Sequence, residues 1–378
     1  MKAKLNRRDF LAHAAVGVAG LGVVVEAHAQ EKAASAPYKV ALIAEPGAGH
    51  LDLHLSVLAR IDAVGSVIFV DPSGTLEEIA RKALGTKLGA VGKDAAALLA
   101  AEKPVLALVT VEAVHGPAAI EAALNAGCSV LAEKPACVDA ADFERCVALA
   151  ERQGLHVMLA LVNRVKPEFA EARRIVAEGL IGKVYGVEMH LIQDQTRLTS
   201  PTYQASWMAD KARAGGGHLS WLGIHWLDLA MFITGSKIDK VAAFTGNVGG
   251  QALNIEDSAA VTMRFDNGTF GTLTSGYYLD KGYESRLKIW GSKGWLEVTD
   301  DTQTPLRWRS TVEGTEAAES SFSAPEERDP YLVFTQVALE ACVAGTAPPI
   351  SGVESLRVLK TVYGAYEAAS AGKTVEVK

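Results

Sequence analysis

The chain has 378 residues, of which 49% are hydrophobic and 21% charged, which leaves room for two globular domains and excludes collagen-like, disordered and small disulfide-rich proteins. Its 37 basic and 44 acidic residues give a formal net charge of -7, so it lacks the basic field that nucleic acid requires, and nucleic acid is not an expected partner. A chain of this length buries a sufficient core without disulfides, and we expect its four cysteines to be free.

The first 29 residues have the pattern of an export leader. Four basic residues within residues 1–8 precede an apolar run over 10–25, and Ala27-His28-Ala29 supplies a small-residue cleavage site. The apolar run is shorter than the ~20 residues that span a bilayer, so no stable membrane anchor is expected. Arg7-Arg8 resembles the twin-arginine signal of proteins that are exported folded. We therefore expect the twin-arginine export machinery as a partner and a periplasmic location.

After a short linker over residues 30–36, short apolar runs alternate with longer segments of helical periodicity. The predicted strands are 40–44, 67–70, 88–91, 105–109, 129–132 and 156–161. The predicted helices between them are 51–61, 76–84, 94–101, 117–126 and 140–153. Continuous apolar strands that alternate with helices are typical of a parallel sheet covered on both faces. Residues 37–162 are therefore predicted to form a doubly wound, Rossmann-type α/β domain.

From residue 163 the pattern changes to closely spaced strands. A helix over 167–178 and a strand over 184–192 come first, and a glycine-rich break at 215–217 leads into a helix that ends near residue 234. Two hairpins follow, pairing 259–265 with 269–273 and 286–290 with 295–298, and the last helix covers 354–371. Neighbouring strands indicate antiparallel pairing, so residues 163–378 are predicted to form an α+β domain with a large open antiparallel sheet.

The turn after the first predicted strand is where the pyrophosphate of a dinucleotide would rest on a helix N-terminus. It reads Ala44-Glu45-Pro46-Gly47-Ala48-Gly49-His50, which keeps only the third glycine of a G-x-G-x-x-G pattern. Pro46 lacks a backbone N–H and weakens phosphate binding without excluding it, because Gly47 and Gly49 still allow a tight turn. Asp71, after the second strand, is either an acceptor for ribose hydroxyls or an ordinary turn residue.

Glu133-Lys134-Pro135 follows a predicted strand and places a lysine at the sheet edge where such folds bind ligands. This tripeptide resembles the Glu-Lys-Pro motif of the glucose-fructose oxidoreductase/inositol dehydrogenase/MocA (Gfo/Idh/MocA) family. The match continues in Asn163-Arg164 with Pro167, in residues 179–184, in Gly215-Gly216-Gly217, in residues 223–228 and in the ending over 331–377. The resemblance covers essentially the whole chain after the leader.

The resemblance implies an oxidoreductase that uses NAD or NADP to transfer a hydride to or from a hydroxyl-bearing carbon of a sugar or polyol. Lys134 would contact the reacting hydroxyl and the cofactor, and His225 would be the general acid/base, which are the two group types that this chemistry needs. A homodimer or homotetramer through the antiparallel sheet is also implied. The full set of expected cofactor-binding residues is Pro46, Gly47, Gly49, His50, Asp71, Thr110, His115, Glu133, Lys134, Asn163 and Arg164. The expected substrate-binding residues are Lys134, Arg164, Trp207, His218, Trp221 and His225.

The chain departs from the family pattern four residues before His225. The commonest pattern is Asp-x-Gly-x-His, and this chain has Trp221, which cannot ionise, at the aspartate position. Asp228 could orient the His225 imidazole from the next helical turn, or could be structural. Trp221 and His218 either line the substrate pocket or pack within the helix. His218 and His225 would lie about 10.5 Å apart along a helix, too far for one metal ion, so no metal is expected.

Export in the folded state predicts a tightly bound NAD or NADP, because a cofactor loaded before export need not be acquired outside. Such a cofactor must be regenerated in place, by oxidising one substrate and reducing another. The alternative within the family is a redox-neutral cycle of the kind used by NAD-dependent glycosidases and epimerases. A non-catalytic carbohydrate-binding protein also stays open, because Pro46 and Trp221 alter two positions where the chemistry is strict.

Overall fold

The computed structural model describes residues 37–315, 318–323 and 329–378. The predicted signal peptide and linker lie outside these residues. Within the described part of the chain, no helix combines the length and the hydropathy needed to cross a membrane.

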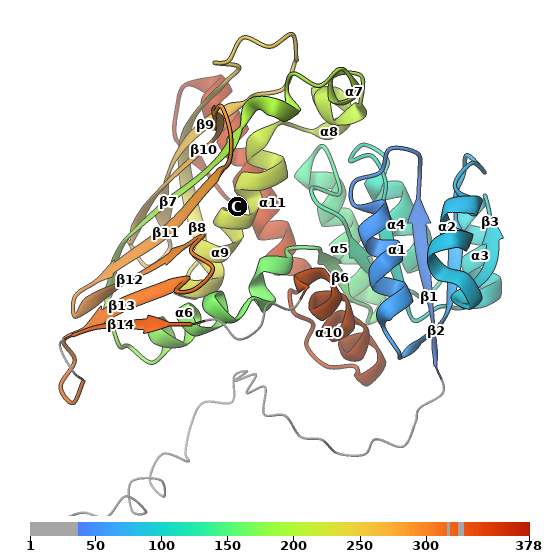
Figure 1. Ribbon diagram of the computed structural model, residues 1–378, viewed down its shortest axis with the longest axis horizontal. Helices are drawn as coiled ribbons and strands as arrows, with labels where there is room; N and C mark the ends of the chain where they lie inside the picture. Colours follow the sequence, from blue (N-terminus) through green and yellow to red (C-terminus); the bar gives the residue numbers. More distant parts are fainter. Residues whose placement is uncertain (1–36, 316–317, 324–328) are drawn as a thin grey trace, which may run out of the picture. The chain divides into compact units, whose positions relative to one another are not determined.

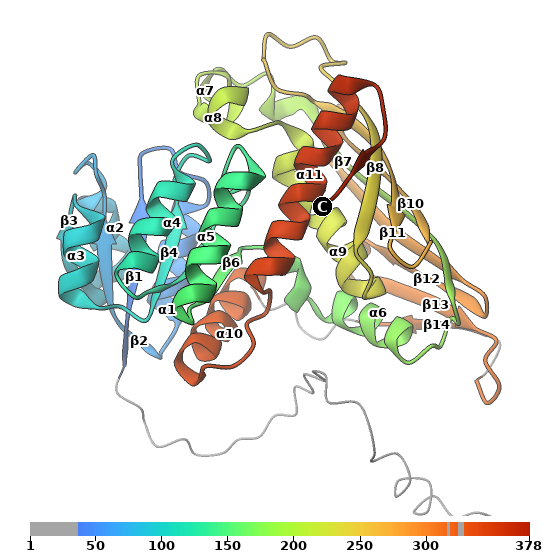
Figure 2. The same cartoon turned by 180° about the vertical axis from the view of Figure 1, so that it is seen from behind.

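Six parallel strands form the first sheet, in the order β3-β2-β1-β4-β5-β6 (Figure 1). They are β1 (Tyr38–Ala44), β2 (Val64–Val70), β3 (Leu88–Gly92), β4 (Leu106–Thr110), β5 (Ser129–Ala132) and β6 (Val157–Leu159). The helices between them are α1 (Leu51–Arg60), α2 (Glu77–Leu84), the 3-10 turn η1 (Gly85–Lys87), α3 (Ala95–Glu102), α4 (Gly116–Asn125) and α5 (Ala140–Gln153). Helix α1 lies in front of the sheet in Figure 1, and α4 and α5 lie in front of it in Figure 2. The predicted doubly wound domain is confirmed.

The central strands are apolar throughout because both faces of this sheet are covered. Every residue of β4 and β5 is buried, and Phe69 and Phe143 are among the largest fully buried side chains. Burial of this kind is the main favourable contribution to the stability of the fold. It also fixes the carboxyl ends of β1, β4 and β5 side by side, which is where the candidate site lies.

The second sheet has nine strands in the order β14-β13-β12-β11-β7-β10-β9-β8-β15. They are β7 (Val184–Asp194), β8 (Ile238–Gly246), β9 (Ser258–Phe265), β10 (Phe270–Leu279), β11 (Tyr283–Gly291), β12 (Gly294–Thr299), β13 (Leu306–Ser310), β14 (Glu319–Phe322) and β15 (Val375–Glu376). All pairs are antiparallel except β7 with β10, which run parallel. The predicted open antiparallel sheet is confirmed as a mostly antiparallel one; the parallel pair joins strands that β8 and β9 separate along the chain.

Helices cover one face of the second sheet and leave the other open. The helical elements are η2 (Val162–Val165), α6 (Pro167–Ala177), η3 (Gln195–Arg197), α7 (Pro201–Gln204), η4 (Trp207–Ala209), α8 (Lys211–Ala214), η5 (Leu219–Gly223), α9 (Ile224–Thr234), α10 (Pro330–Ala344) and α11 (Gly352–Ala371). Helices α9 and α11 pack against β7 and β8. The exposed aromatic side chains on the strands of this sheet are Tyr185, Phe244, Phe270, Tyr278, Tyr283 and Trp290.

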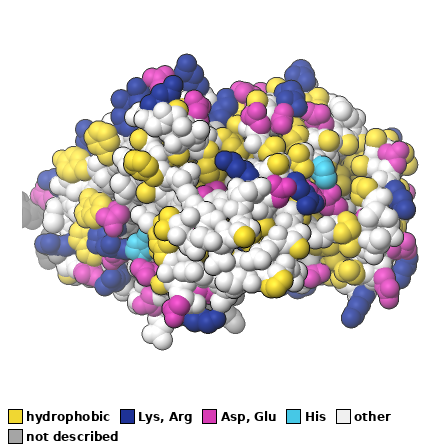
Figure 3. All heavy atoms as spheres, turned by 90° about the horizontal axis from the view of Figure 1, so that it is seen from above, with side chains coloured by type: hydrophobic (Ala, Val, Ile, Leu, Met, Phe, Trp, Pro, Cys, Tyr) yellow, Lys and Arg dark blue, Asp and Glu magenta, His cyan; other side chains and the backbone are white. Residues whose placement is uncertain are grey.

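Two features were not predicted. Helix α10, which the sequence pattern did not indicate, packs against α1 of the first domain although it begins 270 residues after α1 ends (330 − 60). The segment before α9 is a π-helical turn, η5, which inserts an extra residue into the helical register. The predicted helix through His218 and His225 is present, and its five residues 219–223 are π-helical. Figure 3 shows basic and acidic side chains intermingled over most of the face that it presents.

Candidate active site

The loop between β1 and α1 offers unpaired backbone donors. Gly47 has a φ of 76° and His50, the N-cap of α1, has a φ of 60° and makes no side-chain capping bond. The N–H groups of Gly47, Gly49 and His50 have no hydrogen-bond partner within the described residues. An uncapped helix N-terminus with free N–H groups favours an anion such as a pyrophosphate. The loop therefore fits a dinucleotide even though Pro46 contributes no donor.

Two tryptophans from the second half of the chain lie against this loop. The indole Nε1 of Trp207 donates to the carbonyl oxygen of Gly47 at 2.8 Å. A Cβ atom added to Gly49 would lie 3.6 Å from the Trp221 ring, so the indole rests on the loop backbone. The two rings are 5.2 Å apart, and both residues are buried. Trp207 and Trp221, predicted to bind substrate, thus border the cofactor loop.

Lys134 follows β5 and is buried with only 4% of its surface exposed. Its Nζ donates to the main-chain oxygen of Trp221 at 2.8 Å and lies 4.4 Å from the centroid of the Trp221 ring. Burial lowers the pKa of Lys134 to about 8; the charge of Glu133 opposes this shift and that of Arg197 adds to it. The amine of Lys134 can therefore take up or release a proton near neutral pH.

His225, the second residue of α9, is also buried. Burial, and then the charge of Lys134, lower the pKa of His225 to about 3, so its imidazole is neutral at neutral pH. Its Nδ1 atom is buried and has no hydrogen-bond partner among the described residues. A neutral imidazole with a free ring nitrogen can hydrogen-bond a ligand hydroxyl.

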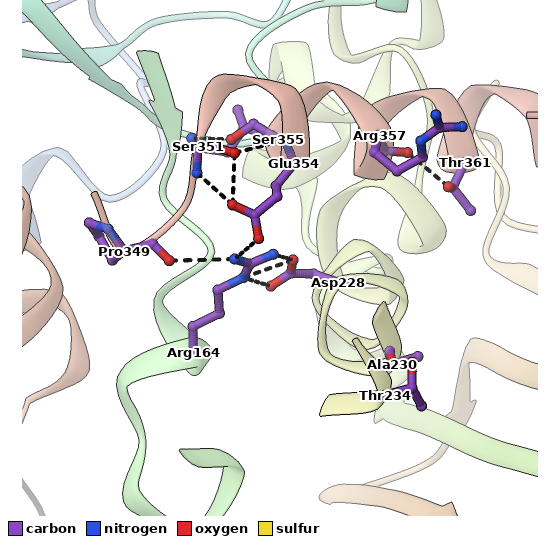
Figure 4. A network of polar contacts seen from close by, with 11 residues as sticks. Arg164, Asp228, Ala230, Thr234, Pro349, Ser351, Glu354, Ser355, Arg357 and Thr361 are labelled. Atoms are coloured by element: carbon purple, nitrogen blue, oxygen red, sulfur yellow. Dashed lines mark hydrogen bonds and ion pairs between the residues drawn. The ribbon is translucent and has the colours of Figure 1, made fainter. Parts of the chain in front are cut away.

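The side chains expected to assist His225 and to bind ligand instead form a structural ion pair (Figure 4). Nε and Nη2 of Arg164 donate to the Asp228 carboxylate at 3.0 and 2.6 Å, and Nη1 donates to Glu354 at 2.9 Å and to the carbonyl of Pro349. Asp228 therefore takes the structural role of its two alternatives, and its carboxylate accepts hydrogen bonds from Arg164 rather than from the His225 Nδ1 atom. The guanidinium of Arg164 is thus used within the protein, and its contact with cofactor or substrate stays a prediction. Its neighbour Asn163 accepts a hydrogen bond from the Lys166 N–H through its main-chain oxygen.

Glu133 and His50, both expected to bind cofactor, bind each other. Oε1 of Glu133 lies 3.1 Å from Nδ1 of His50 and 3.1 Å from Nε2 of His54, and the Tyr331 hydroxyl lies 3.0 Å from His50 Nδ1. Although burial raises the pKa of Glu133, the hydrogen bonds from the two histidines outweigh it and hold that pKa well below its usual range. His54 and Tyr331 were missed, since the pairing of α1 with α10 is a tertiary contact.

The Asp71 side chain stabilises the turn in which Asp71 lies. Its carboxylate accepts hydrogen bonds from the Ser73 N–H at 2.9 Å, the Ser73 hydroxyl at 2.6 Å and the Leu76 N–H at 2.8 Å. The geometry thus supports the turn interpretation, and the ribose contact stays a prediction. Thr110 donates its hydroxyl hydrogen to the carbonyl of Gly49 and so supports the loop from β4.

His115 lies next to two carboxylates in the one described cluster whose ligand atoms are close enough for a metal ion, Glu45, Glu112 and His115. The carboxylate of Glu112 pairs with Arg213, and Glu45 accepts the Glu112 N–H and lies 3.0 Å from His115 Nδ1. Because an arginine already neutralises Glu112, these contacts account for the cluster as a set of ion pairs.

His218 is fully buried and its Nε2 atom has no hydrogen-bond partner among the described residues, so its contact with substrate stays a prediction. Its Nδ1 lies 2.7 Å from the Ser275 hydroxyl, its ring meets Tyr277 edge-on at 4.5 Å, and burial, followed by the charge of Arg197, lowers its pKa to about 3. Arg197 was not singled out in the sequence, yet its charge acts on both His218 and Lys134. No motif marks Arg197; only the end of β7 brings it to the site.

Comparison with known proteins agrees with this geometry. Residues 14–161 match the model of the oxidoreductase family with an NAD-binding Rossmann fold, and residues 169–297 match that of the GFO/IDH/MocA C-terminal domain. D-apiose dehydrogenase of Paraburkholderia graminis is 25% identical over 344 residues, 86% of each chain. Myo-inositol 2-dehydrogenase of Thermotoga maritima is 24% identical over 66% of this chain and 72% of its own.

Solved structures share the fold. A levoglucosan dehydrogenase in complex with NADH and L-sorbose has a TM-score of 0.81 at 16% identity and covers 91% of this chain and all of its own. Aldose-aldose oxidoreductase from Caulobacter crescentus has a TM-score of 0.75 at 20% identity, over 90% of this chain and 99% of its own. The family model matched by the first domain places the chain in a class of oxidoreductases with an NAD-binding Rossmann fold. Within that class, the chain belongs to the Gfo/Idh/MocA family.

Proposed function

We propose that this protein is an NAD(P)-dependent dehydrogenase that transfers a hydride between the nicotinamide and a hydroxyl-bearing carbon of a sugar or polyol. The observation that carries the proposal is the pair of Lys134 and His225, which share one buried site beside the uncapped glycine loop. The activities named for its relatives, on D-apiose and myo-inositol, support a substrate of this class.

The residues of the site would have different roles in such a reaction. The N–H groups of Gly47, Gly49 and His50 would hold the pyrophosphate of the cofactor, and the bound nicotinamide supplies a hydride acceptor. Lys134 and His225 would hold the substrate hydroxyl, and one of them would remove its proton as the carbon is oxidised. Their burial keeps water away from the reacting carbon, which strengthens each of these electrostatic interactions.

The test is a direct search for the nucleotide and for turnover. The purified protein is denatured and its supernatant assayed for NAD and NADP, and the intact protein is then assayed for nicotinamide reduction with D-apiose, myo-inositol, levoglucosan and common aldoses. Lys134→Met serves as the inactive control, and Lys183→Met, on the surface, as the matched active one. A protein that releases no nucleotide, is not stabilised by added NAD or NADP and reduces neither would overturn the proposal.

We further propose that the cofactor is held tightly. Segment 207–221, which runs from Trp207 to Trp221, is tied to the loops that would hold the nucleotide: Trp207 donates to Gly47, Arg213 pairs with Glu112, and the Val114 N–H donates to the Arg213 carbonyl. Release of a bound nucleotide would require these contacts to open. Nucleotide that survives extensive dialysis supports tight binding, and complete loss within minutes contradicts it.

Export by the twin-arginine route to the periplasm remains our proposal for the location, resting on Arg7-Arg8 and the apolar run that follows. Fractionation of cells that express the full chain tests it. The native chain should appear in the periplasm in shortened form, and Arg7→Lys/Arg8→Lys should keep it inside the cell. Equal export of the two chains would remove the twin-arginine assignment.

A further inference from the structure

Lys134 is held without a carboxylate. Its Nζ donates to the main-chain oxygen of Trp221 at 2.8 Å and lies 4.4 Å from the centre of that ring. The neighbouring carboxylate of Glu133 is turned toward His50 and His54, each 3.1 Å away. Among the described residues Lys134 forms no ion pair. The ammonium group is therefore stabilised by one carbonyl dipole and one aromatic face.

These partners stabilise a positive charge less than a carboxylate in contact with it does. The charged groups that act on Lys134 are Glu133, which favours its protonated form, and Arg197, which disfavours it. His225 is neutral and adds no charge. Burial is the largest of these effects, so the pKa of Lys134 lies below the ordinary value of a lysine.

The Trp221 ring is fixed in its place from several sides. It rests on Gly49, lies 5.2 Å from the Trp207 ring and packs with Ala113 and Ala214. Its Nε1 atom is buried without a hydrogen-bond partner in the described part of the chain. Contacts of the ring face and edges therefore set the position of the Trp221 side chain, and Lys134 Nζ lies over the face. The buried indole N–H makes no hydrogen bond that would add to these contacts.

We propose that Trp221 is the positioning residue that makes Lys134 the proton acceptor of the reaction, while His225 acts as a neutral hydrogen-bonding partner of the substrate. The inference rests on the proposed function. In the oxidation of an alcohol, the substrate O–H bond breaks and a new N–H bond forms on the neutral amine of Lys134, as the hydride leaves the carbon for the nicotinamide. An imidazole as hard to protonate as that of His225 is a poor acceptor for the same proton.

Titration of Lys134 itself tests the inference independently of turnover. Full-length protein is labelled with lysine carrying 13C at the ε-carbon, and the Lys134 resonance is assigned by its absence from Lys134→Arg. The native resonance should titrate near pH 8, Trp221→Phe should leave the midpoint close to that value, and Trp221→Asp should raise it by about one to three pH units. Trp221→Asn, equal in size to aspartate but uncharged, should raise it less.

The same variants give a second readout in kcat/KM. The pH profile for oxidation of an alcohol should rise to a plateau with its midpoint near pH 8 in the native protein and at a higher pH in Trp221→Asp. A native Lys134 that titrates above about pH 10, or a midpoint unmoved by the aspartate, overturns the inference. If Trp221→Asp does not fold, two other titrations of Lys134 decide: that of the native protein and that of Glu133→Gln. Glu133→Gln should lower the midpoint of Lys134, because the Glu133 charge raises it. Absence of turnover in the native protein would overturn only the proposed function, because the titration needs none.

Discussion

Arg164 and Asp228 form a buried ion pair that joins the segment leaving the first sheet to helix α9, which carries His225. Both side chains are at most 4% exposed, and Glu354 at the start of α11 makes a further contact with Arg164. Burial favours the neutral form of Asp228 and raises its pKa, although the charge of Arg164 opposes the shift. The pair therefore positions α9, and with it the imidazole, at the cost of two buried charges.

Removal of one partner should leave the other charge buried and unpaired. We expect Arg164→Met and Asp228→Asn each to lower the free energy of unfolding by about 3–5 kcal/mol. The double variant Arg164→Met/Asp228→Asn should lose less than the sum of the two. Urea denaturation followed by far-UV circular dichroism measures each value, and strictly additive losses would show that the pair has no coupling.

Lys134 should be indispensable for turnover but not for folding. Lys134→Met removes a buried ammonium group and should lower kcat by at least about 10²-fold while the melting temperature stays the same or rises. Lys134→Arg, which keeps a charge that does not titrate, should be equally inactive. Substantial turnover by either variant would take Lys134 out of the proposed mechanism.

Arg197 should tune the acceptor from a distance. Because its charge lowers the pKa of Lys134, Arg197→Met should raise that pKa and move the rising limb of the kcat/KM profile to higher pH. Arg197→Lys, which keeps the charge, serves as the control and should leave the limb in place. A shift in the opposite direction would show that Arg197 acts on another group.

Acid should weaken the fold through Glu133. The folded-state pKa of this carboxylate lies below its ordinary value of 4.5, so its contribution to stability is present above that pH and is lost as the pH falls further. Glu133→Gln should therefore cost about 2–3 kcal/mol at pH 7 and flatten the decline in stability below pH 4.5. Glu78→Gln, on an exposed helix face, is the matched control. If the stability of Glu133→Gln falls equally steeply below pH 4.5, other carboxylates cause the decline.

The Trp207 hydrogen bond should slow the release of nucleotide. Trp207→Phe keeps an aromatic ring but removes the N–H that reaches Gly47, and should speed dissociation of NADH by about 2- to 10-fold. Stopped-flow fluorescence measures the rate, with Trp290→Phe on the exposed face of the second sheet as the control. Unchanged dissociation from Trp207→Phe would mean that segment 207–221 does not restrain the cofactor.

The open face of the second sheet should join copies of the chain. Phe244 is 83% exposed and Phe270 64% exposed on its strands, and apolar side chains in such positions favour burial in a dimer or tetramer. Phe244→Glu/Phe270→Glu should shift the mass measured by light scattering toward the monomer at micromolar concentration. A native protein that is already monomeric there would contradict the expected oligomer.

The sequence by itself determined both sheets and the two residues proposed for catalysis. Alternation of apolar strands with helices predicted the parallel sheet, since a strand covered on both faces must be apolar throughout. Glu133-Lys134-Pro135 and His225 lie where their motifs indicated, because each directly follows or begins a regular element. These are properties that a short stretch of chain carries on its own.

Only the tertiary structure decided what each polar side chain contacts. Arg164, Asp228 and Glu133 were plausible ligand-binding groups, yet their partners come from α9, α11 and α1, and no local pattern specifies such pairings. The tertiary structure also decided the contacts of Trp221. The sequence showed only that a tryptophan occupies the position of the aspartate in the family pattern. In the fold its carbonyl and ring face hold Lys134, because the π-helical turn and the glycine loop bring them together.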